Sequence, residues 1–97
     1  MTKVKLASAD GLYVLIAKGH ATGSPEVCAA VSCLLYTLAG WLKNRKGEKR
    51  PCVCNMSEAH ANIIWDGEGA ETAFEIMMIG FLQLAKAFPK YICVEIE

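Results

Sequence analysis

Apolar and polar positions alternate loosely at the start of the chain, which is typical of strands. Lys3–Ala9 (KVKLASA) shows this alternation and ends at Asp10-Gly11, a strong hairpin-turn signal. The β-rich run Leu12–His20 (LYVLIAKGH) follows directly. We therefore expect the chain to open with a hairpin of two antiparallel strands.

The spacing of apolar residues then becomes helical. Ser24 suits the N-cap, Pro25 the first helical position, and Glu26 the positive end of the helix dipole. Apolar residues recur every three or four positions from there: Val27, Val31, Leu34, Leu35, Leu38 and Leu42. This pattern predicts a first helix from about Pro25 to Leu42 or Lys43.

The second half of the chain shows the pattern of another hairpin, then of another helix, and then of a last strand. Pro51–Ser57 and Ala59–Trp65 indicate a second hairpin, and Asp66–Gly69 breaks the chain. Ala70–Phe88 has apolar residues at helical intervals and stops before Pro89. Tyr91–Ile96 (YICVEI) reads as a final strand.

The expected order of elements is ββαββαβ in one domain, residues 1–97. Without the first strand this is βαββαβ, the order of a ferredoxin-like core. Right-handed crossovers would place both helices on one face of a mostly antiparallel sheet. The fold class is thus α+β, a two-layer sandwich.

Charge and composition argue against nucleic acids and membranes as binding partners. Ten basic and ten acidic residues give no electrostatic footprint for nucleic acid or an anionic membrane. We interpret the basic cluster Lys43–Arg50 as a solvated loop. The apolar run Val27–Leu42 is too short to cross a bilayer, so we expect a buried helix and no membrane partner.

The five cysteines point to a reducing compartment. We find no secretory signal pattern at the start of the sequence, and an odd number of cysteines argues against a fully paired disulfide framework. We therefore expect a cytoplasmic protein with reduced thiols.

The stretch GHATGSPEVCAAVS, Gly19–Ser32, carries the most specific chemistry. His20 ends a strand, and Cys28 lies in the first turn of the next helix, with seven residues between them. A helix N-terminus favours a thiolate, and a nearby imidazole would form an ion pair able to attack a peptide carbonyl. We expect the amides of Glu26, Val27 and Cys28 to be available for an oxyanion.

Other residues of this stretch fit supporting roles. Ser32 lies four residues after Cys28 and therefore on the same helical face. Thr22, Gly23 and Ser24 would form a turn that admits a substrate strand.

Two alternatives stay open at this point. Cysteine is often buried, so Cys28 could simply pack in the core of a non-catalytic interaction module. Alternatively, Cys52, Cys54 and His60 could bind a metal, although two cysteines and one histidine are an incomplete ligand set. We therefore assign no metal site and no cofactor.

The same residues resemble a known family. GHA (Gly19, His20, Ala21), then an acidic residue and VCAAVS (Val27–Ser32), is similar to the signature of the ribosomal-processing cysteine proteases, often called Prp. The segment AFEIMMIGFLQLAKAFPKYICVEI also resembles the C-terminal half of that family. The likeness covers most of the chain.

This resemblance implies a function. Members are small cytoplasmic homodimers of bacteria that remove an N-terminal extension from a large-subunit ribosomal protein, and phage relatives process virion proteins. The catalytic residues of the family fall on His20 and Cys28, and its helix serine on Ser32. The supporting or substrate-binding residues would be Gly19, Ala21, Thr22, Gly23, Ser24, Glu26 and Ser32.

One departure from the family pattern concerns the loop before the cysteine. The loop between His20 and Cys28 is shorter than in the family, and the usual acidic position three residues before the cysteine is Pro25. Glu26 stands one step closer. The departure bears on the role of the acidic residue and on substrate preference.

Overall fold

The computed structural model describes residues 1–19, 24–45, 53–57 and 59–97. Within these ranges it has two helices and five strands in the predicted order. The elements are β1 (Thr2–Ala9), β2 (Leu12–Lys18), α1 (Pro25–Asn44), β3 (Val53–Ser57), β4 (His60–Trp65), α2 (Ala70–Ala87) and β5 (Ile92–Ile96). Where the described residues permit a comparison, the predicted boundaries differ by no more than two residues.

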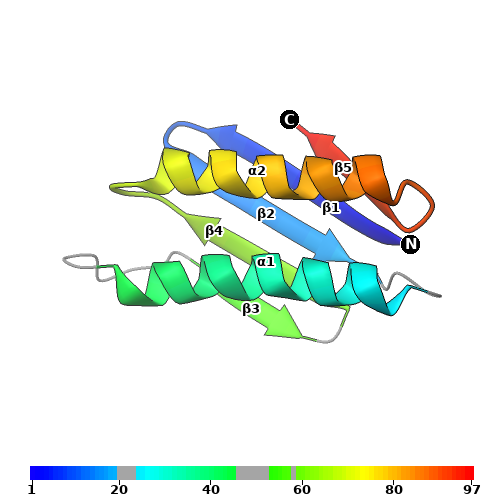
Figure 1. Cartoon of the computed structure of the whole chain (residues 1–97). Helices are drawn as coiled ribbons and strands as arrows, with labels where there is room; N and C mark the ends of the chain where they lie inside the picture. The colour runs from blue at the N-terminus through cyan, green and yellow to red at the C-terminus, as the bar shows by residue number, and fades with distance from the viewer. Residues whose placement is uncertain (20–23, 46–52, 58) are drawn as a thin grey trace.

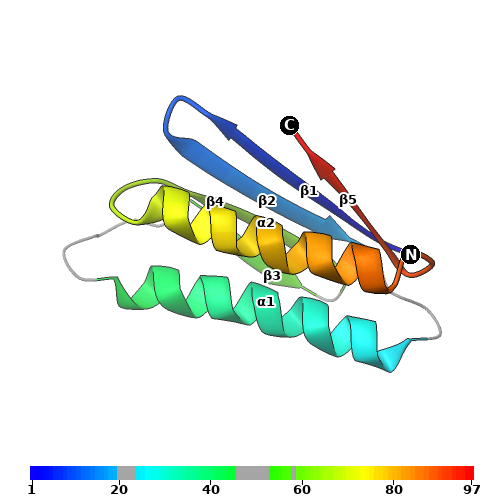
Figure 2. The same ribbon diagram turned by 45° about the horizontal axis from the view of Figure 1, so that its top comes forward.

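The strands form one mixed sheet of order β3-β4-β2-β1-β5. All neighbouring pairs are antiparallel except β1 and β5, which run parallel. Figures 1 and 2 show both helices on the same face of this sheet, as predicted. The ferredoxin-like core is present, and β1 is inserted between β2 and β5.

The first hairpin turns where the sequence predicts. Asp10 and Gly11 both have positive φ angles, 52° and 81°, as in the type I′ turn that joins two-residue hairpins. Ala9 pairs with Leu12 across this turn. The turn therefore fixes the register of β1 against β2.

The core lies between the helices and the sheet. Its fully buried side chains come from both layers, because every second residue of a strand and one stripe of each helix face inward. The largest are Trp65, Phe81, Leu6, Leu15, Leu38, Ile63, Ile92 and Val27. By length and composition alone α1 could also cross a membrane, but its buried side chains belong to this core.

A glycine lets the two helices approach closely. A Cβ atom at Gly80 of α2 would lie 2.9 Å from Cδ2 of Leu34 on α1. This contact fixes α1 beside α2, and the start of α1 carries the candidate nucleophile.

Candidate active site

Ser24 caps α1 with both its side chain and its backbone. Its Oγ accepts a hydrogen bond from the Val27 amide (3.3 Å), and its carbonyl accepts one from the Cys28 amide (3.2 Å). The hydroxyl donates in turn to Oε2 of Glu26 (3.2 Å). Ser24 is only 4% exposed, so this cap is a buried part of the fold.

The cap corrects one expectation about the oxyanion. Two of the three amides expected to be available, those of Val27 and Cys28, donate to Ser24. The Cys28 amide makes the first ordinary helical hydrogen bond, to the carbonyl four residues earlier, and the N-cap hydroxyl takes the otherwise unpaired Val27 amide. The Glu26 amide is the one donor of the three that the cap does not use.

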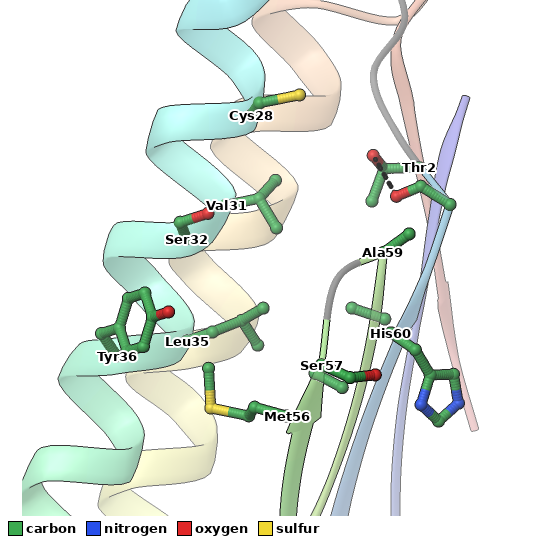
Figure 3. A pocket seen from close by; sticks show the side chains of 13 residues that line it. Thr2, Cys28, Val31, Ser32, Leu35, Tyr36, Met56, Ser57, Ala59 and His60 are labelled. Carbon is green, nitrogen blue, oxygen red and sulfur yellow. Dashed lines mark hydrogen bonds between the residues drawn. The ribbon is translucent and has the colours of Figure 1, made fainter.

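Cys28 lies half-buried on the wall of a cavity of about 540 Å³. The cavity lies between α1 and the ends of the strands nearest to it, and in Figure 3 the Cys28 side chain projects into this space on the side of Thr2. Both polar and apolar residues line it, some through their backbone: Thr2, Ala17, Gly19, Cys28, Val31, Ser32, Leu35, Tyr36, Met56, Ser57, Ala59, His60 and Ala61. The sulfur is therefore not sealed in the core.

Gly19 lies at the end of β2, on the same cavity. Its φ angle is +88°, and a Cβ atom at this position would lie 2.6 Å from the Met1 carbonyl oxygen. Its amide donates to the Ala59 carbonyl (2.8 Å), and its carbonyl accepts from the Thr2 hydroxyl (3.2 Å). Only glycine fits both this backbone angle and this space.

The other predicted site residues divide into two groups. Ser32 is exposed and lines the cavity one helical turn after Cys28, and Glu26 is exposed and accepts the Ser24 hydroxyl. His20, Ala21, Thr22 and Gly23 lie outside the described residues.

Residues of the alternative metal site lie on opposite faces of the sheet. Cys54 pairs with buried Ile63 on the helix side, whereas exposed His60 pairs with Ser57 on the other side. Figure 3 shows the His60 ring pointing away from α1 and Cys28. Among the described residues no group of three or more His, Cys, Asp or Glu side chains could hold a metal, and Cys52 lies outside them.

Residues 1–93 match the family described as "Cysteine protease Prp". The chain belongs to this family. The prediction of a cysteine protease is confirmed, and the non-catalytic interaction module is set aside. No curated protein matches the chain in sequence.

Solved structures agree with this fold. The essential ribosomal processing protease Prp from S. aureus, in complex with a covalently linked product peptide, is 20% identical, with a TM-score of 0.81 and full coverage of both chains. The same protease with a substrate peptide gives 19% identity, full coverage and a TM-score of 0.80. SMU.848 from Streptococcus mutans is 24% identical with a TM-score of 0.73, over 99% of this chain and 93% of the other.

Sequence reasoning missed residues that the Prp fold brings to the cavity from other strands. Thr2 from β1, Met56 from β3 and Ala59 before β4 all line the cavity that holds Cys28. For Thr2 a signal existed, because the register of the first hairpin places residue 2 opposite residue 19. For Met56 and Ala59 the placement depends on the order of strands in the sheet.

Proposed function

We propose that this Prp protease uses His20 and Cys28 as its catalytic pair. The observation that carries the proposal is the shared cavity: Cys28, in the first turn of α1, and Gly19, which directly precedes His20 in the chain, both line it. A cysteine at a helix start next to open space has the environment of a reactive thiol. The described cysteines form no disulfide with one another.

The proposed reaction is thiol-dependent peptide hydrolysis. His20 accepts the Cys28 proton, and the thiolate sulfur attacks the scissile carbonyl carbon to give a tetrahedral intermediate. The intermediate collapses with cleavage of the C–N bond, and the imidazolium protonates the leaving amine. A water molecule, deprotonated by His20, then hydrolyses the thioester and restores the thiol.

We assign the oxyanion contact to the Glu26 amide. The Ser24 cap uses the next two amides of the first turn, and proline at position 25 has no N–H to offer. A single helix amide is a weaker oxyanion site than the pair found in most acyl-transfer enzymes. A second donor would come from Gly19–Ser24 or from the substrate itself.

The proposed substrate is a protein with a cleavable N-terminal extension. The S. aureus protease of the same fold is named as a ribosomal processing enzyme and binds a substrate peptide, which supports a large-subunit ribosomal protein as the substrate here. A phage virion protein is the second candidate substrate, and it would be cleaved by the same reaction. The Thr22–Ser24 turn, Ala21 and Ser32 are the proposed substrate contacts.

An extended peptide fits the outer edge of the sheet. In the described structure β3 is one of the two edge strands, β5 being the other, and it pairs only with β4. Met56 and Ser57 of β3 also line the Cys28 cavity. A substrate segment added along β3 would pair through its backbone and lead into that cavity.

We further propose that the protein is a cytoplasmic homodimer. Its family supports the compartment, as does the lack of a disulfide between the cysteines that the structure describes. Several large apolar side chains on the two helices remain exposed: Tyr36 (68%), Trp41, Ile76 (56%), Ile79 (57%) and Leu82. An exposed apolar set of this kind is typical of a protein–protein interface.

Alkylation with iodoacetamide at different pH values tests the nucleophile. We expect one thiol, at Cys28 by peptide mapping, to be alkylated faster than the other cysteines near neutral pH. Cys28→Ala should remove the fast phase. Cys33→Ala is the matched control, because Cys33 is an exposed cysteine of the same helix and should contribute only slow alkylation.

Incubation with candidate proteins tests the substrate. The wild type is mixed with N-terminally extended large-subunit ribosomal proteins and with virion proteins, and the new N-termini are sequenced. Cleavage at one site by the wild type, absent in Cys28→Ala and in His20→Ala, supports the proposal. Equal cleavage by His20→Ala would overturn the His20–Cys28 pair.

A further inference from the structure

We infer that Thr2 is a positioning residue for the proposed base, His20. The hydroxyl of Thr2 donates a hydrogen bond to the Gly19 carbonyl oxygen (3.2 Å; dashed line in Figure 3). That carbonyl belongs to the peptide group that joins Gly19 to His20. The inference rests on the proposed function, because it assigns His20 the role of the base.

Thr2 is buried, and its backbone is hydrogen-bonded to the segment before β5. Its side chain is 3% exposed, although threonine is a residue that usually lies at the surface. Its amide donates to the Tyr91 carbonyl (2.9 Å), which ties the start of β1 to the residue that precedes β5. Because the backbone of Thr2 is fixed in this way, its hydroxyl is held in place to bond the Gly19 carbonyl.

The hydrogen bond from the Thr2 hydroxyl to Gly19 lies where the backbone pairing of β1 with β2 ends. Lys3 pairs with Lys18, so the next pair in register is Thr2 with Gly19. Gly19 has a φ angle of +88°, which turns the chain out of β2. The side chain of Thr2 thus supplies the contact at the point where the backbone pairing stops.

Gly19 is held by two different strands as a result. Its amide donates to Ala59, directly before β4, and its carbonyl accepts from Thr2 of β1. With its amide and its carbonyl both bonded, Gly19 is held by the sheet directly before His20 in the chain. Catalytic groups depend on such support, because a 1 Å misplacement can cost about a hundredfold in rate.

Steady-state kinetics of Thr2→Val test this role. Valine keeps the shape of threonine and removes the donor, and Thr2→Ser keeps the donor. We expect Thr2→Val to lower kcat about tenfold with little change in KM, and Thr2→Ser to stay within about threefold of the wild type. Thr2→Ala is a second deletion of the hydroxyl, for the case in which the valine variant does not fold.

A double-mutant cycle separates positioning from general support of the fold. The readout is the rate of Cys28 alkylation by iodoacetamide near neutral pH, which requires no substrate. Thr2→Val should slow alkylation in the wild-type background and have no further effect in His20→Ala, because its action passes through His20. A merely structural role would slow alkylation equally in both backgrounds and would overturn the inference.

The outcomes distinguish this inference from the proposed function. If His20→Ala abolishes cleavage while Thr2→Val behaves like the wild type, the His20–Cys28 pair stands and the role of Thr2 is wrong. If His20→Ala leaves both cleavage and alkylation unchanged, both proposals fail.

Discussion

The backbone amide of Cys28 donates a hydrogen bond to the carbonyl of Ser24 at 3.2 Å. The residue that caps α1 thereby fixes the position at which the cysteine enters the helix. Since the cap also binds the Val27 amide and the Glu26 carboxylate, one buried serine organises the whole first turn. We therefore expect the proposed reactivity of Cys28 to depend on this cap, which mutation can change.

Replacing Ser24 with alanine should weaken both the helix and the thiol. The Val27 amide would lose its partner, at a cost of about 1 kcal/mol in the free energy of unfolding. Loosening of the first turn should also slow alkylation of Cys28. Urea unfolding and alkylation kinetics measure the two effects.

Ser24→Thr is the matched control, because threonine keeps a hydroxyl that can accept from the Val27 amide and donate to Glu26. It should restore the free energy of unfolding toward that of the wild type. Equal stability of Ser24→Ala and the wild type would contradict the cap described above.

Gly19→Ala should destabilise the protein and abolish proteolysis. Alanine at a φ of +88° is strained, and its Cβ would lie 2.6 Å from the Met1 carbonyl oxygen. We expect a loss of about 1–3 kcal/mol in the free energy of unfolding. Thermal unfolding and the cleavage assay check both effects.

Gly40→Ala is the corresponding control within α1. A Cβ at Gly40 meets no atom within 4 Å, and alanine is favoured over glycine in a helix by up to about 1 kcal/mol. This variant should be as active as the wild type and slightly more stable. A wild-type Tm for Gly19→Ala would show that the close approach of Met1 is easily relieved.

Ile79→Glu tests the proposed dimer through the exposed face of α2. Ile79 is 57% exposed, and a buried carboxylate at an apolar interface carries a large desolvation cost. We expect the variant to sediment as a monomer at concentrations at which the wild type is a dimer. Asn55→Glu adds the same charge at an exposed polar position of β3, on the face of the sheet away from both helices, and should remain dimeric.

Chelation should leave proteolysis unchanged. The proposed mechanism uses a thiolate and an imidazole only, and Cys54 and His60 lie on opposite faces of the sheet. The cleavage rate is measured before and after dialysis against EDTA. Loss of activity that zinc restores would favour the metal alternative with Cys52.

Local sequence patterns were sufficient for the elements of this fold. The positive φ angles of Asp10 and Gly11 and the Ser24 cap are local features, and residues within a few positions determine them. The alternation in β1 and the helical spacing in α1 likewise predicted which side chains are buried. Cys28 was placed at the helix start for the same reason.

Contacts between distant segments could not be read in this way. The position of β1 between β2 and β5 depends on a parallel pairing across almost the entire chain. The cavity likewise combines Thr2 with Met56 and Ala59, which meet only when the sheet order is known. The competition of Ser24 for the first-turn amides also required side-chain geometry.

The insertion of β1 has a consequence for folding during synthesis. The β1–β2 hairpin involves only neighbouring residues of the chain and forms quickly. The other neighbour of β1 in the sheet is β5, which is about ninety residues further along the chain than β1. Until translation delivers β5, a nascent chain has an unprotected strand edge at β1, a hazard for aggregation. We expect chains truncated before residue 92 to associate through this edge, and refolding of the full chain to be limited by the arrival of its last strand.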